Sequence, residues 1–402
     1  MTSALLFGAS GISGWSVTRE LLRYPTPTTF SKIIALSNRP LDPGAALLDD
    51  ERLNFAHGVD LTKPVEEVVS KLKEVGGEDV ERVTEVFWYA YVHKPDDGDL
   101  VATNAQILDT TLRALKEVCP KMRHFIWQTG AKYYGVEYLS SHPDLVAPAP
   151  WEETQPRRPE PLYSKIFYYK QLDIIAEYAK DASWSYNDLR PGPIIGYSPT
   201  PNAMNLALSV GVYLSIYRAI HGLGATVPLP ASLAGAQAVN SESPADDIAR
   251  VSIFLALKSD SALKGKSFNV ADEDSTYERR WPGLAKAWGL VGAPPDTRTS
   301  EEDPTARAIE WARSQTDTWH ELKEKHGLRI DLEQIDFDFF SVLGMPQDRR
   351  MSTKALREAG WNGEPTGIGA YVEAWTLCLV WKALRLKIGT GMSVCWQWRR
   401  ID

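Results

Sequence analysis

The sequence predicts an α/β protein built on a doubly wound parallel sheet. Its first apolar run, from Ala4, leads into glycines at Gly8, Gly11 and Gly14, and a helical pattern, WSVTRELLR, follows directly. Alternating strand and helix patterns continue behind it. A strand that enters a helix through a glycine-rich turn gathers unpaired backbone N–H groups and the positive end of the helix dipole. This context favours a pyrophosphate site, in a Rossmann-type sheet, over glycines that only permit a tight turn.

Length, charge and cysteine content restrict the class of protein further. The 402 residues fit one large α/β domain with an elaborated C-terminal part. A net charge of −8 argues against nucleic acid and anionic membranes as partners, because clustered Lys and Arg bind both. The cysteines Cys119, Cys378 and Cys395 show no metal-site spacing, and we expect no bound metal. The sequence shows no secretory signal or membrane-spanning segment, so we expect a cytoplasmic protein. Its oligomeric state stays open, and a homodimer is among the expected assemblies.

The end of the second predicted strand, KIIALSNRP (32–40), indicates which cofactor binds. NAD enzymes commonly place an acidic residue there for the ribose 2′-hydroxyl, whereas this chain has Ser37, Asn38 and Arg39. These side chains suit a 2′-phosphate, so NADP(H) is favoured over NAD(H). The alternative is that Arg39 is only an exposed loop cation.

Further strands are predicted within 54–64, ending at Asp60 and Leu61, over 84–92, within 123–135, with Lys132 just past the strand end, and within 183–199, where a Pro/Gly turn follows. Helices are predicted from Asn104 to Val118 and from Phe167. Ligands of such sheets lie at the carboxyl ends of the strands. The predicted cofactor-binding residues, drawn from the glycine turn and these strand ends, are Gly8, Ser10, Gly11, Ile12, Gly14, Ser37, Asn38, Arg39, Asp60, Leu61, Ala90, Tyr91, Thr129, Pro191, Gly192, Ile194 and Ser198.

The C-terminal half is predominantly helical by pattern. We assign residues 1–199 to the cofactor-binding core, 200–386 to a mainly helical substrate-binding lid interleaved with the core, and 387–402 to a tail without a role. A short strand, KSFNVAD (266–272), and a helix that begins at Asp246 and Asp247 interrupt the lid. The predicted substrate-pocket residues are Tyr91, Tyr133, Tyr134, Met204 and Asn205.

The usual short-chain dehydrogenase has a Tyr with a Lys four residues later, the ammonium lowering the pKa of the phenol. None of the sixteen tyrosines here has this partner. A lysine can instead come from another segment: Lys132 follows the fifth strand and Tyr168 opens the next helix, both at the catalytic edge of the sheet. We predict this pair to be catalytic, although singly each fits a solvated lysine and a packing tyrosine.

At these positions the chain resembles the progesterone 5β-reductase and iridoid synthase-like (PRISE) branch of the short-chain dehydrogenases, over about residues 4–385. The matching motifs are GASGISG (8–14), ALSNRP (35–40), VDL (59–61), TGAKYYG (129–135), IFYY (166–169), LRPGPIIGYSP (189–199), and PADDIA (244–249) before KSFNVAD. The resemblance implies that Lys132 and Tyr168 are the catalytic pair of an NADPH-dependent ene-reductase. Hydride would add to the β-carbon of an enone or enal, on a terpenoid- or steroid-like substrate, while Tyr168 stabilises the enolate.

Three departures from the family pattern bear on these expectations. Asn38 stands where a second basic residue is common, Tyr91 where a tryptophan is often found, and the sequence after Lys387 has no counterpart. Two other functions stay open. One is an NADP-dependent carbonyl reductase or epimerase on the same scaffold, and the other is a cofactor-binding regulator without catalysis.

Overall fold

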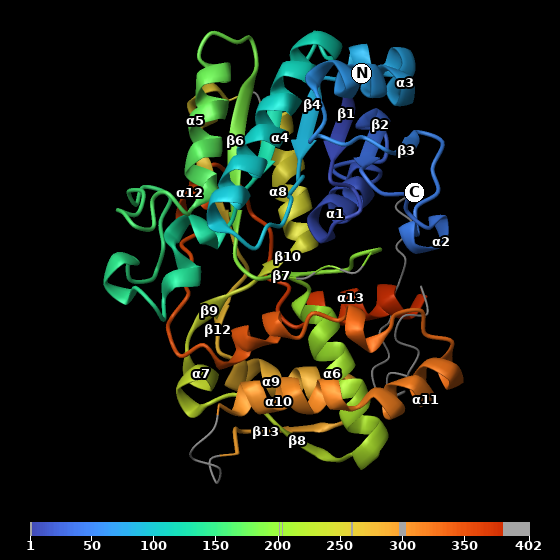
Figure 1. The fold of residues 1–402 in the computed structure, drawn as a ribbon, viewed down its shortest axis with the longest axis vertical. Helices are drawn as coiled ribbons and strands as arrows, with labels where there is room; N and C mark the ends of the chain where they lie inside the picture. The colour runs from blue at the N-terminus through green and yellow to red at the C-terminus, as the bar shows by residue number, and fades with distance from the viewer. Residues whose placement is uncertain (1, 201, 203, 259, 297–302, 381–402) are drawn as a thin grey trace.

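The computed structural model describes residues 2–200, 202, 204–258, 260–296 and 303–380. These residues form a sheet flanked by helices, and beside its lower edge a second part made mostly of helices (Figure 1). The predicted tail, 387–402, and Cys395 lie outside the described residues.

Seven parallel strands form the central sheet. From one edge to the other they are β11 (Ser267–Val270), β6 (Ser185–Pro191), β5 (His124–Gln128), β4 (Glu85–Trp88), β1 (Thr2–Phe7), β2 (Phe30–Ser37) and β3 (Leu53–His57). β1 lies between β2 and β4, with Leu5 opposite Ile34 of β2 and Val86 of β4. The strand order reverses between β1 and β4, and ligands of such sheets bind at the carboxyl edge of this switch point. The prediction of a Rossmann-type sheet is confirmed.

Helices cover both faces of the sheet because its strands are apolar on both sides. Leu5 and Phe7 of β1 enter one core, whereas Ala4 and Leu6 enter the other, as the two-residue period of a strand requires. The first core is closed by α3 (Val65–Gly76), α4 (Asp97–Val118) and α5 (Phe167–Ala179). The second is closed by α1 (Ile12–Leu21), α8 (Ala245–Leu257) and α12 (Lys354–Glu358).

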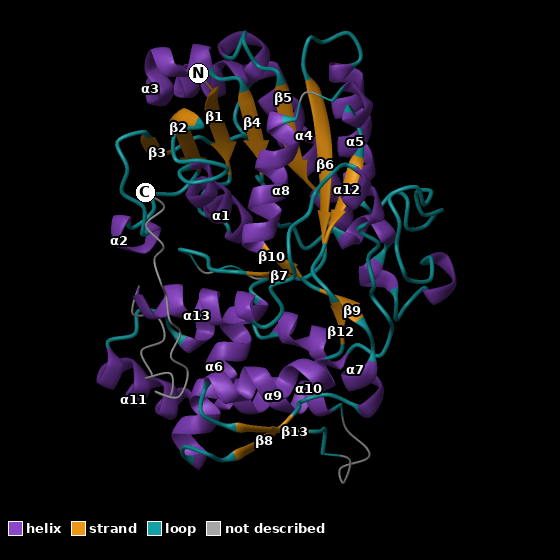
Figure 2. Ribbon diagram, turned by 180° about the vertical axis from the view of Figure 1, so that it is seen from behind, coloured by secondary structure: helices purple, strands orange, loops and turns teal. Residues whose placement is uncertain are grey.

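The second part, here called the helical part, has its own core. Figure 2 shows its helices grouped below the sheet, with a two-stranded ribbon of β8 (Thr226–Pro228) and β13 (Val291–Ala293) at the far end. Its helices are α6 (Leu206–His221), α7 (Leu233–Gln237), α9 (Tyr277–Ala287), α10 (Pro304–Ser314), α11 (Thr316–His326) and α13 (Gly369–Val380). The aromatic rings of Tyr213, Trp281, Trp288 and Trp375 lie buried in the core between them.

Short segments join the two parts. They are the paired strands β7 (Ile194–Ile195) with β10 (Ser243–Pro244) and β9 (Asn240–Ser241) with β12 (Asp274–Ser275), and the helix α2 (Pro43–Ala46). Seven 3₁₀ segments are η1 (Gly77–Arg82), η2 (Ala131–Tyr134), η3 (Val136–Tyr138), η4 (Pro143–Leu145), η5 (Ser261–Leu263), η6 (Leu332–Gln334) and η7 (Asp338–Gly344).

Several predicted boundaries were wrong. The strand expected to end at Asp60 and Leu61 ends at His57, because Gly58 adopts a φ of 83° and turns the chain. The strand expected to reach Val92 ends at Trp88, so Tyr91 lies in the loop beyond it. The fifth strand ends at Gln128, and Lys132 lies past its carboxyl end, as predicted. The helix expected from Asn104 begins at Asp97, where the Asp96 side chain accepts a hydrogen bond from the Asp99 amide.

None of the helices in the described ranges has both the length and the hydrophobicity to span a lipid bilayer. Across the same residues, no group of three or more His, Cys, Asp or Glu side chains is placed to hold a metal ion.

Glu85 gives the fold a predictable pH dependence. It is buried at the start of β4, where Oε1 meets Arg123 at 2.7 Å and Oε2 has no hydrogen-bond partner. Burial raises the pKa of this carboxyl to about 7, from 4.5, although Arg123 opposes the rise. Because the pKa of Glu85 is higher in the folded state than in the unfolded state, its protonated form stabilises the fold. This stabilisation is fully present below about pH 4.5 and is lost as the pH rises through about 7.

Relative to Glu85→Gln, the native protein should therefore lose on the order of 1–3 kcal/mol of unfolding free energy between weakly acidic and alkaline pH. Urea unfolding at a series of pH values measures this difference. Glu81→Gln, at an exposed position of η1, serves as the control and should run parallel to the native protein. Parallel curves for Glu85→Gln and the native protein would contradict the prediction.

Candidate active site

The turn after β1 can be built only with glycine at two positions. Gly8 has a φ of +86°, and a Cβ there would lie 2.7 Å from the Tyr89 carbonyl. A Cβ on Gly14 would lie 2.1 Å from the carbonyl oxygen of Gly8, far inside contact distance. The glycines thus bring the start of α1 against the end of β1.

The amino end of α1 offers hydrogen-bond donors to a ligand. Gly11 caps the helix without a side chain, and the first N–H groups of any helix have no partner within it. The Ser13 hydroxyl is buried here with no hydrogen-bond partner. An orphaned hydroxyl beside a glycine cradle and a helix amino end fits the pyrophosphate of a dinucleotide. Ser13 was missed in the sequence, although it stands inside the GASGISG motif.

The loop after β6 returns to this turn. The Thr200 hydroxyl donates to the carbonyl oxygen of Ser10 at 3.0 Å, and the Ser198 hydroxyl donates to the Thr200 carbonyl at 2.7 Å. Gly192 lies farther back, where its N–H donates to the Ser243 hydroxyl and a Cβ would lie 2.6 Å from the Ser241 carbonyl oxygen. The predicted residues Ser10 and Ser198 are thus neighbours, and the loop is anchored where Ile194 of β7 pairs with Ser243 of β10.

The residues predicted to contact the adenine-side ribose of the cofactor lie at the carboxyl end of β2. Ser37 is buried and its hydroxyl donates to the Arg39 carbonyl at 2.6 Å, so it shapes the loop. Asn38 and Arg39 are exposed, and the described residues provide no hydrogen bond or ion pair to the Arg39 guanidinium. Asp60 accepts hydrogen bonds from the Thr62 amide and hydroxyl, which lower the pKa of its carboxyl.

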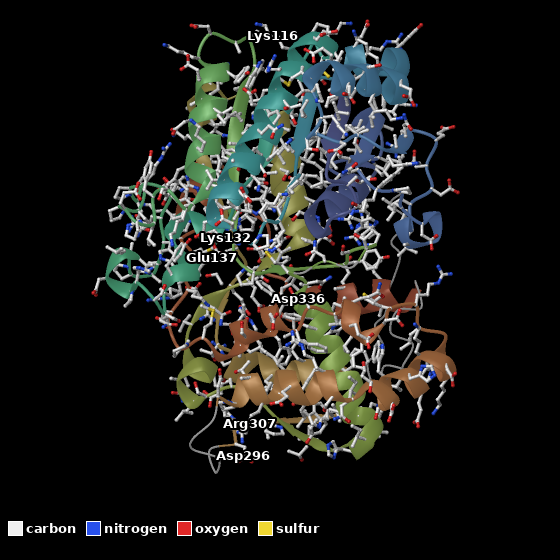
Figure 3. All side chains as sticks on the ribbon, viewed as in Figure 1. Lys116, Lys132, Glu137, Asp296, Arg307 and Asp336 are labelled. Carbon is white, nitrogen blue, oxygen red and sulfur yellow. The ribbon has the colours of Figure 1, made fainter. Side chains whose placement is uncertain are left out.

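The predicted catalytic residues lie at the same carboxyl edge, farther along the sheet. Lys132 stands in η2, and its Nζ lies 2.6 Å from Oε1 of Glu137 in η3. Figure 3 shows these two side chains adjacent, on the side of the sheet that faces the helical part. Tyr168 opens α5, and its hydroxyl lies 3.5 Å from the position a Cβ on Gly130 would take.

Burial, and after it the neighbouring charges, keep the phenol of Tyr168 neutral. Burial raises the pKa of this hydroxyl well above 10, and the nearby Glu137, Tyr91 and Asp188 raise it further. The same Glu137 raises the pKa of Tyr91 while Lys132 lowers it, with burial as the larger effect. Glu137 and Tyr91 therefore lie within electrostatic reach of Tyr168, and Lys132 lies within electrostatic reach of Tyr91. Within the described residues, Lys132 has an ion pair with Glu137 and no hydrogen bond to Tyr168.

A buried ion pair in β6 packs against this site. Asp188 and Arg190 of β6 pair at 2.7 Å, and the predicted residue Thr129 donates to Asp188 at 2.6 Å. The Arg190 guanidinium lies 3.5 Å from the centre of the Tyr133 ring. Asp188 and Arg190 were not predicted as site residues. Two charged residues inside the strand SYNDLRP were the available signal.

The tyrosines next to Lys132 and Tyr168 have structural contacts. Tyr134 is buried, stacks on Trp151 and donates to the Asn269 side chain. The Tyr169 hydroxyl donates to the Tyr133 carbonyl and accepts from the Arg158 amide. Tyr91, in contrast, is 38% exposed at the site.

The other two predicted pocket residues lie at the amino end of α6. Met204 is exposed, and Asn205 is buried as the cap of this helix. Within the described residues, no hydrogen bond joins either of them to Tyr133 or Tyr134.

A cavity of about 440 Å³ lies elsewhere, beyond the carboxyl end of β11. Asp247, Asp272, Met351, Lys354 and Trp361 are among its lining residues, and none of the predicted site residues lines it. Its lining residue Met351 packs in the same buried cluster as Tyr133 and Tyr134, so the cavity adjoins the candidate active site.

Comparison with known proteins places this geometry in a family. A family model described as a PRISE-like Rossmann-fold domain matches residues 4–377. Short chain dehydrogenase sirQ of Leptosphaeria maculans is 34% identical over 381 residues, covering 93% of this chain and 95% of that protein. The 3-oxo-Delta(4,5)-steroid 5-beta-reductase of Arabidopsis thaliana is 27% identical, covering 85% and 83%. The (S)-8-oxocitronellyl enol synthase ISY1 of Nepeta cataria is 28% identical, covering 85% and 82%.

A solved structure shares the fold at lower identity. The UDP-glucose 4-epimerase of Thermus thermophilus, a complex with NAD, is 17% identical with a TM-score of 0.55, covering 93% of this chain and 99% of that one. This likeness extends to the fold alone. The family model and the sirQ relative carry the assignment: the chain belongs to the PRISE-like Rossmann-fold family of short-chain dehydrogenases.

Proposed function

We propose that this protein is an NADPH-dependent reductase of activated C=C bonds in enones or enals. The observation that carries the proposal is a largely buried, protonated Tyr168 whose hydroxyl lies near Gly130, two residues before Lys132, at the sheet edge that also holds the glycine turn. A reduction of this kind needs a hydrogen-bond donor for the carbonyl oxygen that becomes an enolate.

Separate groups of residues bind the cofactor and stabilise the reacting carbonyl group. The glycine turn and Ser13 would hold the cofactor phosphates at the amino end of α1. When bound, the reduced cofactor would supply a hydride for the β-carbon, and the electron pair of the C=C bond would move toward the carbonyl oxygen. Tyr168 donates a hydrogen bond to that oxygen and stabilises its negative charge. A proton from water then completes the saturated carbonyl product at the α-carbon.

The relatives support this chemistry by their names. One is called a steroid 5-beta-reductase and another an oxocitronellyl enol synthase, and both names fit reduction beside a carbonyl group. Terpenoid- or steroid-like enones are therefore the substrate class to test first.

A paired substrate panel tests the proposal. The purified protein is incubated with NADPH and cyclic enones, open-chain enals, and the saturated ketones and aldehydes that correspond to them. We expect NADPH oxidation with the unsaturated members and saturated carbonyl products by mass spectrometry. Reduction of the saturated ketones alone would instead establish a carbonyl reductase. Tight NADPH binding without turnover on any member would establish a cofactor-binding regulator.

Arg39→Ala tests the preference for the phosphorylated cofactor. An exposed guanidinium without a protein partner is available to a 2′-phosphate, and a hydrogen bond between charged groups is worth about 1.5–3 kcal/mol. The dissociation constant of NADPH should rise about 10- to 100-fold while that of NADH stays unchanged, as measured by fluorescence titration. Lys116→Ala removes the same charge from the last turn of α4, at the top of the view in Figure 3, and should change neither constant. Equal weakening of both cofactors by Arg39→Ala would remove Arg39 from the proposal.

A further inference from the structure

We propose that Asp188 and Arg190, the buried ion pair of β6, are positioning residues of this reductase. Together they hold both ends of the site turn, residues 129–134, and thereby fix the backbone that faces the Tyr168 hydroxyl. This inference rests on the proposed function for its catalytic consequence. The hold on the turn itself can be measured without turnover.

The pair comes from alternate positions of one strand. Asp188 and Arg190 stand two residues apart in β6, so their side chains leave the same face of the strand. Nε of Arg190 donates to Oδ2 of Asp188 at 2.7 Å, and the two residues are 0% and 2% exposed. Such a pair adds little net stability compared with apolar side chains of similar volume, because the desolvation of the charges offsets their attraction. The groups that the pair contacts therefore indicate its role.

Asp188 holds the first residue of the site turn. The Thr129 hydroxyl donates to Oδ1 of Asp188 at 2.6 Å, and the Thr129 amide donates to the Leu189 carbonyl at 2.8 Å. A hydrogen bond to a carboxylate is stronger than one between neutral groups, and Thr129 is buried away from competing water. Side chain and backbone thus both fix Thr129 to β6.

Arg190 holds the other end of the site turn. Its guanidinium lies 3.5 Å from the centre of the Tyr133 ring, and Nη1 donates to the Tyr134 hydroxyl at 3.4 Å. Nη2 donates to the Ser267 hydroxyl of β11 at 2.8 Å, which fixes the plane of the group. A planar guanidinium can stack on a ring and donate within its own plane at the same time, whereas an ammonium cannot.

The part of the turn that faces Tyr168 lies between these two ends. A Cβ on Gly130 would lie 3.5 Å from the Tyr168 hydroxyl and 3.3 Å from the carbonyl oxygen of Pro191, the last residue of β6. Glycine places no side chain there, and Lys132 follows two residues later. A displacement of about 1 Å at a reacting group can lower a rate about 10²-fold. The position of the turn therefore sets the room for the carbonyl oxygen that Tyr168 is proposed to bind.

Thr129→Val tests the hold at the first end, because it removes the hydroxyl and keeps the branched shape. We expect kcat for enone reduction to fall about 10- to 100-fold, with KM and the NADPH dissociation constant changed less than about twofold. Thr129→Ser retains the hydroxyl and should keep at least about half of the native kcat. Equal losses in the two variants would overturn the inference. Weaker NADPH binding at unchanged kcat would overturn it as well, because Thr129 would then be a cofactor contact.

Arg190→Lys tests the other end while keeping a cation beside Asp188. The ammonium has no flat face for the Tyr133 ring, so kcat should fall about 10- to 100-fold. In a Tyr133→Leu background the same substitution should have an effect at least about threefold smaller. An undiminished effect in that background would show that Arg190 does not act through the turn.

Arg123→Lys is the matched control for Arg190→Lys. Arg123 pairs with the buried Glu85 at 2.7 Å, at the amino ends of β4 and β5 and thus at the opposite edge of the sheet. Its kcat should remain within about twofold of the native value, because the site turn keeps its contacts. A loss equal to that in Arg190→Lys would identify general damage to the sheet as the cause and overturn the inference.

Hydrogen–deuterium exchange gives a readout that needs no turnover. In the site turn and directly after it, the Tyr133 amide donates to the Gly130 carbonyl at 2.9 Å and the Gly135 amide to the Lys132 carbonyl at 3.0 Å. Exchange of the peptide with these amides should quicken at least about fivefold in Thr129→Val and in Arg190→Lys, and should stay unchanged in Arg123→Lys. Unchanged exchange in the first two variants would overturn the inference. If the native protein reduces no enone but the exchange quickens as expected, the proposed function fails and the positioning of the turn stands.

Discussion

Tyr168→Phe is expected to lower kcat for enone reduction by about 10²–10³-fold with little change in KM. Removing one preorganised donor to a developing oxyanion typically has this effect, because the donor acts mainly in the transition state. The phenyl ring preserves the packing of Tyr168 against Phe167, whose ring centre lies 4.2 Å away. Steady-state kinetics at saturating NADPH, with an enone from the panel, measure both constants.

Tyr178→Phe is the matched control for this prediction. It removes a hydroxyl from the same helix α5, but this one donates to Asp109 at 2.8 Å, ten residues beyond Tyr168 along the helix. Its kcat should remain within about twofold of the native value, since the group is about 15 Å away along the axis. Comparable losses in the two variants would indicate damage to α5 and remove Tyr168 from the mechanism.

Gly14→Ala should destabilise the protein by about 2–4 kcal/mol and abolish detectable NADPH binding. The added Cβ would lie 2.1 Å from the Gly8 carbonyl oxygen and 2.7 Å from its carbonyl carbon, which are backbone atoms that no rotamer change can move. Either α1 shifts away from β1 or the turn opens, and both outcomes disturb the donors at the helix end. Urea unfolding measures the stability, and fluorescence titration measures the binding.

Gly11→Ala distinguishes this steric effect from a general intolerance of the turn. Its φ is −84°, and the nearest atom to an added Cβ is the Gly8 carbonyl oxygen at an ordinary 3.4 Å. The unfolding free energy should therefore change by less than about 1 kcal/mol. A stability loss in Gly11→Ala as large as that in Gly14→Ala would show that the contact with Gly8 is not the cause.

The fold was predictable where one residue pattern has one structural solution. An apolar run, three glycines and an amphipathic helix can hardly be arranged except as strand, turn and helix, and β1 and α1 follow that pattern. Strand ends were less predictable, because the apolar pattern continues past the last ladder hydrogen bond. Val59 and Leu61 are buried beyond β3, so burial alone extended the predicted strand.

The site was predictable in part for a similar reason. Lys132 and Tyr168 could be placed at one edge because topology fixes where strands end. Glu137 could not be found this way, since it lies in a 3₁₀ turn without periodicity and an acidic residue in such a loop is normally solvated. Ser13 and Asp188 become notable only through burial, which a single sequence does not display.

The chain passes back into the sheet after leaving it. The edge strand β11 and the covering helix α8 come from residues 245–270, between helices of the helical part. An exchange of substrate specificity between family members therefore cannot treat residues after 199 as one transferable module. A chimera joined at that point would replace not only the pocket but also the edge strand β11 and the helix α8 that covers one face of the recipient's sheet. Segments should therefore be exchanged one at a time, leaving β11 and α8 of the recipient in place.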